Sequence, residues 1–356
     1  MVISRTPFRI SFFGGGTDYP AWYREHGGAV LGMAIDKYCY ITCRYLPPFF
    51  EHRLRLVYSR MENCQTVAEI QHPSVRAVLG LLNLNRGLEI HHDADLPARS
   101  GMGSSSAFTV GLLHALYALL GRFSSKSQLA SEAIHVEQDL LGETVGAQDQ
   151  VLASFGGLNF VEFKRDGNFR VEPLTIGNDR INELNASLML FYTGLRRTAS
   201  EVAASYVPTI GSRVTQLTRL RQMVDEGIET LSGTGSLEAF GALLDEAWCL
   251  KRSLSGAVSN SMVDQIYEEA RRAGALGGKL LGAGGGGFML FLVPPEFQHR
   301  VQEKLRDLIC VPFQLDSGGS QIIFYSPEQD YAELDRARSH SQPKPFKEHF
   351  AAAENK

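Results

Sequence analysis

The stretch Leu96-Pro-Ala-Arg-Ser-Gly-Met-Gly-Ser-Ser-Ser-Ala107 joins a glycine-containing turn to an apolar run that continues to Leu120. This pattern predicts a loop over 97–104 and a helix over 106–120. Gly101 and Gly103 allow the backbone to approach an anion closely, and the free N–H groups of the first helical turn carry partial positive charge. Taken alone, the stretch fits an ordinary serine-capped Gly/Ser turn better than a phosphate site. Evidence for a phosphate site must therefore come from elsewhere in the chain.

The hydrophobic periodicity on either side predicts that this loop follows a strand and precedes a helix, which is the order that a phosphate site requires. Alternating and apolar runs predict strands, and longer runs of helical period predict helices. The predicted strands cover 9–13, 34–46, 88–92, 158–164, 186–192, 279–282, 288–293 and 321–325. The predicted helices cover 125–141, 145–154, most of 200–273, and 295–308. The sequence therefore indicates a mixed α/β chain with a break between domains around 173–183.

The length and composition of the chain exclude several classes of protein. The chain has 356 residues, of which 44% are hydrophobic, enough for two domains of ordinary size. No apolar run is long enough to cross a bilayer and no signal peptide is evident, so we expect a cytoplasmic protein without a membrane partner. Five cysteines without a Cys-x-x-Cys pattern indicate reduced thiols. A net charge of −4 argues against a nucleic-acid partner.

Two acidic residues fall on apolar helix faces. Glu137 lies within the stripe of Ala133, Val136 and Leu140, and Asp149 occupies a similar position one helix later. An ionised acid buried without a partner is costly, so each should face a cation or a polar cleft. A structural salt bridge explains either acid alone. Beside a phosphate loop, one acid would help to hold Mg²⁺, with Ser105 as a companion to Glu137, and the other would orient an acceptor hydroxyl.

Two further glycine-rich stretches flank this region. The run Arg5-Thr-Pro-Phe-Arg-Ile-Ser-Phe-Phe-Gly-Gly-Gly-Thr-Asp18 suits a polar ligand, although Asp18 fits a simple turn aspartate as well. The run Gly282-Ala-Gly-Gly-Gly-Gly287 matches a dinucleotide fingerprint by letters, but a strand follows where that fingerprint needs a helix. No P-loop motif occurs.

Basic residues for an anionic substrate are harder to select. Arg9, Arg99, Arg196, Arg197 and Lys279 are candidates for a cationic pocket. Lys251 is another candidate, but the pattern favours an exposed surface lysine there more than it does for the arginines. The sequence does not choose among these residues.

The three glycine motifs, in this order, resemble the superfamily of galactokinase, homoserine kinase, mevalonate kinase and phosphomevalonate kinase. The resemblance implies an α+β fold in two domains. Residues 1–178 would form an N-terminal nucleotide-phosphate-binding domain like domain 2 of ribosomal protein S5, and 179–338 a ferredoxin-like domain. Residues 339–356 would be a polar tail. It also implies an ATP-dependent kinase that acts on a small-molecule substrate, with ATP as co-substrate and Mg²⁺ as cofactor.

The resemblance assigns roles to residues of this sequence. Asp149 is similar to the catalytic aspartate, and Ser105 with Glu137 to the magnesium pair. Nucleotide phosphates would be bound by Pro97, Ala98, Arg99, Ser100, Gly101, Met102, Gly103, Ser104, Ser105 and Ser106. The acceptor substrate would be bound by Arg9, Gly15, Gly16, Thr17, Asp18, Tyr192, Gly194, Arg196, Gly284, Gly285 and Gly286.

Within the superfamily, residues 13–23, the run from Gly27, the middle motif and Tyr-Thr-Gly-Leu-Arg-Arg resemble bacterial kinases of D-glycero-D-manno-heptose 7-phosphate. This implies a sugar-phosphate substrate phosphorylated on the anomeric hydroxyl. Galactokinases show Gly-Glu-His-Thr-Asp where this chain has Gly-Gly-Gly-Thr-Asp. The alternatives are another monosaccharide 1-kinase of fucose or galactose type, or a sensor that binds nucleotide and sugar without turnover. A monomer and a homodimer both fit the sequence.

Overall fold

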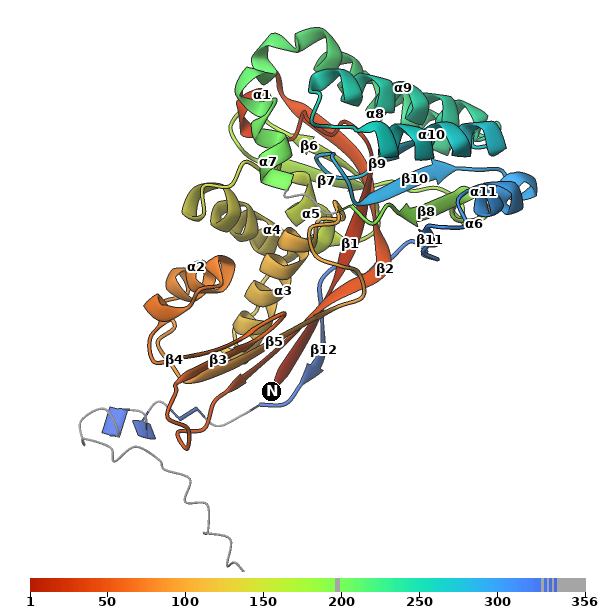
Figure 1. Ribbon diagram of the computed structural model, residues 1–356. Coiled ribbons are helices and arrows are strands. Elements are labelled where there is room, and N and C mark those ends of the chain that lie inside the picture. The colour runs from red at the N-terminus through yellow and green to blue at the C-terminus, as the bar shows by residue number, and fades with distance from the viewer. Residues whose placement is uncertain (196–198, 328–329, 332, 335, 338–356) are drawn as a thin grey trace, which may run out of the picture.

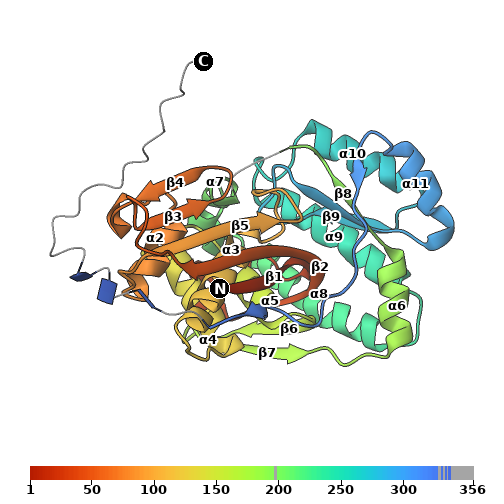
Figure 2. The same cartoon turned by 90° about the horizontal axis from the view of Figure 1, so that it is seen from below.

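The computed structural model describes residues 1–195, 199–327, 330–331, 333–334 and 336–337. Two β-sheets organise these residues, one of eight strands and one of four (Figures 1 and 2). Helices cover both sheets, as expected for an α+β chain.

The larger sheet is built around two long antiparallel strands, β1 and β2, whose pairing runs from Val2↔Cys43 to Phe13↔Leu31. The strand order is β12-β1-β2-β5-β3-β4, and β6 and β7 extend from the first half of β2. The strands are β1 (Val2–Phe13), β2 (Gly28–Tyr45), β3 (Leu54–Val57), β4 (Met61–Cys64), β5 (Leu88–Ala94), β6 (Leu158–Phe163), β7 (Phe169–Pro173) and β12 (Gln321–Tyr325).

Helix α3 (Ser104–Leu119) packs on β1 and β2 and carries the serine-rich motif at its N-terminus. It is apolar on nearly all sides, which fits its position between the sheet and the neighbouring helices. Helix α4 (Lys126–Ile134) begins where the Ser125 hydroxyl accepts a hydrogen bond from the Gln128 N–H, and it continues into a π-helical segment, His135–Leu140. The remaining helices of this part are α1 (Pro20–His26), α2 (Pro73–Leu81), α5 (Gln148–Phe155) and the short 3₁₀ turn Val67–Glu69.

The smaller sheet has the order β11-β8-β10-β9, with all neighbouring pairs antiparallel. Its strands are β8 (Leu188–Tyr192), β9 (Gly277–Leu280), β10 (Phe288–Leu292) and β11 (Ile309–Cys310). In Figure 1, α8, α9 and α10 lie together over this sheet. The helices are α6 (Asn178–Ser187), α7 (Ala199–Ala204), α8 (Val214–Ser232), α9 (Glu238–Leu254), α10 (Ser261–Ala273) and α11 (Gln298–Lys304), with 3₁₀ turns Val207–Ser212 and Pro295–Phe297.

The two parts share one hydrophobic core. Phe12 and Phe13 at the end of β1 contact Phe240 of α9 edge to face, with ring centroids 5.3 and 5.0 Å apart. Strand β12 lies within the range expected for the second domain, yet it pairs with β1 of the larger sheet. The larger sheet is therefore completed by a segment from near the other end of the chain.

Every strand predicted from the sequence is present, although β1 and β2 extend further toward the N-terminus than expected. The predicted helix over 295–308 is wrong in extent, because it divides into a 3₁₀ turn, α11 and the approach to β11. Helices α1, α2 and α6 and strands β3, β4, β7 and β11 were not predicted, since each is short or has weak periodicity. None of the described helices is long and apolar enough to cross a membrane.

Candidate active site

The loop before α3 has the backbone shape expected for a phosphate-binding turn. Arg99, Gly101 and Gly103 all have positive φ angles, of 59°, 78° and 74°. A non-glycine residue in this region is uncommon, and such strain concentrates at functional sites. Ser100 is fully buried, and its hydroxyl has no hydrogen-bond partner. The loop thus leaves polar groups unsatisfied at the N-terminus of α3, where an anion is favoured.

Asp149 meets this loop together with Arg9. The Arg9 guanidinium donates to both carboxylate oxygens of Asp149, at 2.7 and 2.6 Å, and to the Gly101 carbonyl at 2.8 Å. A methyl group on Gly103 would lie 3.3 Å from the Asp149 Oδ2. The Arg9 side chain is buried, whereas the Asp149 side chain is 24% exposed. The carboxylate is therefore fixed in orientation and remains accessible beside the loop.

Glu137 is buried at the other side of the same helix end. Its Oε2 accepts hydrogen bonds from the Ser106 hydroxyl and the Gln150 amide, while its Oε1 has no partner. Burial raises the pKa of this carboxyl to about 7. No described basic residue pairs with it. An unpaired, buried carboxylate oxygen beside a hydroxyl suits a hard cation such as Mg²⁺.

The structure places Ser106, rather than Ser105, against Glu137. Ser105 is exposed, and its carbonyl accepts a hydrogen bond from the Thr109 hydroxyl. The pairing of Ser105 with Glu137 as magnesium ligands thus stays a prediction. Ser106 and Gln150 are contacts of Glu137 that the sequence analysis did not select for this role.

Asp18 links the first glycine motif to α5. Its Oδ1 accepts from the Gly16 N–H at 2.9 Å, and its Oδ2 accepts from the Gln148 N–H at 3.3 Å. Gly146 is required here, because a Cβ would lie 1.9 Å from Asp18 Oδ2. Burial raises the pKa of the Asp18 carboxyl. Thr17 is also buried, and its hydroxyl donates to the Gly14 and Ala29 carbonyls, so this residue shapes the turn.

The third glycine motif packs directly on the phosphate loop. A Cβ on Gly282 would lie 2.6 Å from the Gly101 Cα, and one on Gly287 would lie 2.1 Å from the Ser100 carbonyl oxygen. Thr193, at the end of β8, donates its hydroxyl hydrogen bond to the Gly287 carbonyl at 2.9 Å. These glycines permit backbone-to-backbone contact between two loops that are nearly 200 residues apart in sequence.

Gly284, Gly285 and Gly286 form the buried second part of this motif. Gly285 is tied to the segment before α10, since its N–H donates to the Val258 carbonyl and its carbonyl accepts from Asn260. Tyr192 is half-buried and packs against Phe288, while Gly194 is exposed with a φ of 75°. Arg196 and Arg197 lie outside the described residues.

Two lysines complete the charged groups around the site. Lys279, at the end of β9, is 6% exposed and donates to the Phe12 carbonyl at 2.8 Å. Lys251 of α9 donates to the Leu280 and Gly282 carbonyls. The expectation of an exposed surface lysine at 251 is wrong, because the residue is half-buried and its ammonium donates to two backbone carbonyls. Its helical spacing from the buried residues Leu244 and Trp248 is the signal that could have indicated partial burial.

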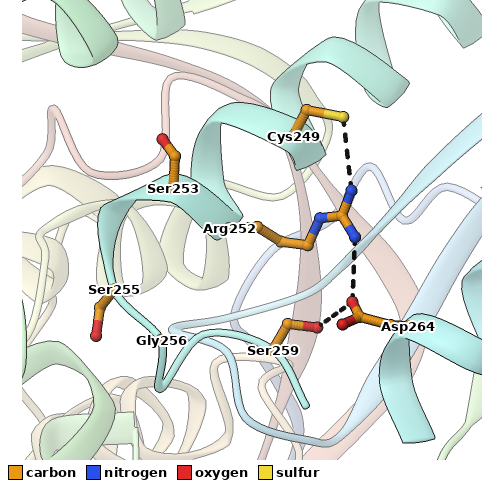
Figure 3. Close-up of a pocket in the computed structure, with 7 residues that line it drawn as sticks. All are labelled: Cys249, Arg252, Ser253, Ser255, Gly256, Ser259 and Asp264. Atoms are coloured by element: carbon orange, nitrogen blue, oxygen red, sulfur yellow. Dashed lines mark hydrogen bonds and ion pairs between the residues drawn. The ribbon is translucent and has the colours of Figure 1, made fainter. Parts of the chain in front are cut away.

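A separate surface pocket of about 480 Å³ lies between the C-terminus of α9 and the N-terminus of α10 (Figure 3). Arg252 spans it, donating to Asp264 at 3.1 Å and to the Cys249 sulfur at 3.7 Å. Ser259 also donates to Asp264, at 2.7 Å. The pocket's arginine is therefore already paired with an acid.

Comparison with known proteins agrees with this geometry. Residues 70–157 match the GHMP kinases N terminal domain, and residues 228–308 match the GHMP kinases C terminal domain. A D-glycero-alpha-D-manno-heptose 7-phosphate kinase of Campylobacter jejuni is 30% identical over 315 residues, covering 85% of this chain and 92% of that protein. The chain belongs to the GHMP kinase family. As a GHMP kinase it is an ATP-dependent phosphotransferase, as the resemblance predicted.

Other relatives of this GHMP kinase extend the comparison. A bifunctional fucokinase/GDP-fucose pyrophosphorylase of Arabidopsis thaliana is 28% identical over 83% of this chain, but the match covers 31% of that longer protein. The crystal structure of a D-glycero-D-manno-heptose 1-phosphate kinase from Bacteroides thetaiotaomicron has a TM-score of 0.75 and 24% identity, covering 92% of this chain and all of the other. The two-domain GHMP fold is therefore confirmed.

Proposed function

We propose that this GHMP kinase transfers a phosphoryl group from ATP to the anomeric C1 hydroxyl of D-glycero-D-manno-heptose 7-phosphate, yielding the 1,7-bisphosphate. The observation that carries the transfer chemistry is the Arg9–Asp149 pair held against Gly103 at the N-terminus of α3. The heptose phosphate is supported by the Campylobacter jejuni relative, which carries that name. A cytoplasmic location remains a prediction of the sequence.

In this mechanism Asp149 orients the acceptor hydroxyl and accepts its proton as the oxygen attacks the γ-phosphorus. The bond from the γ-phosphorus to the bridging oxygen breaks, and ADP leaves with that oxygen. Because two hydrogen bonds from Arg9 hold the carboxylate, its geometry is set before the substrate binds. Orientation of the acceptor hydroxyl by Asp149 should therefore contribute more to the rate than the basicity of its carboxylate.

The nucleotide phosphates would lie along residues 97–106, where N–H groups at the start of α3 face the anion. Mg²⁺ would be held by Glu137 with a hydroxyl from Ser105 or Ser106, because Glu137 Oε1 is buried and unpaired. When bound, the ion would neutralise charge on the phosphate oxygens. The protein residues around it keep the carboxylate oriented through Ser106 and Gln150.

The acceptor would lie near Asp18, Gly15 and Gly16, on the side of Asp149 away from α3. A Cβ on Gly15 would be in ordinary van der Waals contact with side-chain atoms of Gln148 and Ser11, each at 3.7 Å. Galactokinases carry Glu-His at these two positions, so the loss of both side chains is consistent with a substrate other than galactose. Arg9, proposed from the sequence as a substrate contact, already binds Asp149 and so would act through that residue.

A fucose-type 1-kinase is the second candidate, because the Arabidopsis thaliana relative is similar over most of this chain. An assay of ADP release separates the two with fucose, galactose, heptose, heptose 1-phosphate and heptose 7-phosphate as acceptors. We expect kcat/KM to be highest with heptose 7-phosphate. Equal kcat/KM values with the 7-phosphate and the free sugar would refute the proposed substrate. If no acceptor caused ADP release, the result would favour a sensor.

A further inference from the structure

Two lysines near the candidate site have no acidic partner. Among the described residues, neither Lys251 nor Lys279 forms an ion pair, and both donate only to backbone carbonyls. An ammonium group carries three N–H donors. Lys279 uses one of them on Phe12, and Lys251 uses two on Leu280 and Gly282. Each lysine therefore keeps at least one donor for another group.

The charges nearby do not neutralise these lysines. Arg9 is already paired with Asp149, and Asp18 accepts its hydrogen bonds from backbone N–H groups. Burial lowers the pKa of Lys279 to about 7, with a further effect from Arg9. Burial also lowers the pKa of Lys251 well below its usual value, and Lys279 and Arg9 add to this. A bound anion would favour the protonated form of each lysine and so offset the cost of burying its charge.

The two lysines are held beside the glycine motifs by hydrogen bonds to the backbone. Lys251 is anchored to the carbonyls of Leu280 and Gly282, and Gly282 packs directly on Gly101 of the phosphate loop. Lys279 is anchored to the end of β1, a few residues from Arg9. The free lysine donors thus lie where the first, second and third glycine motifs come together.

We propose that Lys251 and Lys279 form an anion site that binds a phosphate group of a substrate at the junction of the three motifs. The phosphate oxygens would accept the lysine donors that the backbone leaves free. The group is either the γ-phosphate of ATP or the phosphate that the acceptor already carries. The naming of these two sources rests on the proposed function, whereas the binding of an anion does not.

Binding of inorganic phosphate to the full chain, measured by calorimetry, tests the site directly. The variants are Lys251→Met and Lys279→Met, and Lys126→Met is the matched control. Lys126 also donates to two backbone carbonyls, those of Phe155 and Gly318, but it is exposed and lies on α4. We expect about 10- to 100-fold weaker binding in each site variant and no change in the control. Unchanged affinity in both folded site variants would overturn the proposal.

A measurement on the unaltered chain covers the case in which a site variant does not fold. Sulfate keeps its charge between pH 6 and 9, so its affinity reports only on the protein. We expect sulfate to bind more weakly as pH rises through about 7, because Lys279 loses its proton in this range. Asp149 and Asp18 are the acids near the lysines, and Arg9 stays charged over this range. A flat affinity between pH 6 and 9 would contradict the site.

Kinetics then identify the source of the phosphate. If the site binds the acceptor's phosphate, Lys251→Met raises KM for heptose 7-phosphate and leaves KM for ATP unchanged. If it binds the γ-phosphate, the variant weakens binding of a non-hydrolysable ATP analogue with any acceptor. Loss of inorganic phosphate binding in a protein that phosphorylates no sugar would support the anion site while refuting the proposed function.

Discussion

Replacing Glu137 by Gln should stabilise the protein in the absence of Mg²⁺, although it should weaken catalysis. The carboxyl is fully buried, one of its oxygens has no partner, and burial raises its pKa from 4.5 to about 7. Between these values the unfolded chain releases a proton that the folded chain retains. The free energy of unfolding therefore falls as pH rises from 4.5 to 7, and the loss is complete above pH 7.

The pKa difference corresponds to a destabilisation of about 3 kcal/mol at pH 8 from the ionised Glu137. Gln removes the charge but places an amide N–H₂ where Oε1 has no partner, which costs about 1–2 kcal/mol. The net gain should be about 1–2 kcal/mol at pH 8, or roughly 1–3 °C in melting temperature. At pH 4.5 the gain should disappear, because the carboxyl is then mostly protonated in the folded chain.

Thermal unfolding at pH 5 and pH 8, with chelator and then with Mg²⁺ and ADP, measures this effect. Glu303→Gln on the exposed face of α11 is the control, and we expect it to leave the melting temperature unchanged. Mg²⁺ with ADP should stabilise the wild type more than the Glu137→Gln variant, since the variant lacks the anionic ligand. A variant that melts below the wild type at pH 8 without metal would refute the reasoning.

Three further predictions address the site and its surroundings. Asp149→Asn should lower kcat by about two to four orders of magnitude while the fold is retained, and near-normal turnover would exclude its role in proton transfer. Gly287→Ala should destabilise the protein by more than about 2 kcal/mol in urea unfolding, because its Cβ meets a carbonyl and its φ is 107°. Gly80→Ala on α2, where a Cβ meets no atom within 4 Å, should instead be neutral or stabilising. In native thiol titration, exposed Cys249 should react at once, whereas Cys39, whose thiol pKa is raised by burial, should react only after unfolding.

The sequence predicted those parts of the structure that depend on local pattern. The strand, loop and helix around residues 88–120 follow from glycines and an apolar run, and the structure agrees with them. The two acids on apolar faces were found because a charge interrupts a hydrophobic stripe. That Glu137 and Asp149 both approach the N-terminus of α3 also agrees with the sequence analysis.

The remaining features depend on contacts between distant segments. Nothing local shows that Arg9 pairs with Asp149, 140 residues away, or that Gly287 packs on Ser100. The choice between Ser105 and Ser106 also depended on the rotation of one helix, which a 3.6-residue period does not fix at its first turn. The expectation for Lys251 was wrong because a lysine on a helix is usually exposed, and its helical spacing from Leu244 and Trp248 was given too little weight.

The pairing of β1 with β12 has a consequence for how the chain folds during synthesis. Residues 2–5 pair with β2 on one edge, but their other edge is paired only by residues 321–325. Phe12 and Phe13 likewise contact Phe240, more than 200 residues later in the chain. A nascent chain would therefore hold the first strand, with Arg9, incompletely covered until most of the polypeptide has left the ribosome. Such long-range closure slows folding and leaves an open strand edge for other chains to pair with. Chaperones that cover this strand edge during translation would then raise the yield of folded, active enzyme.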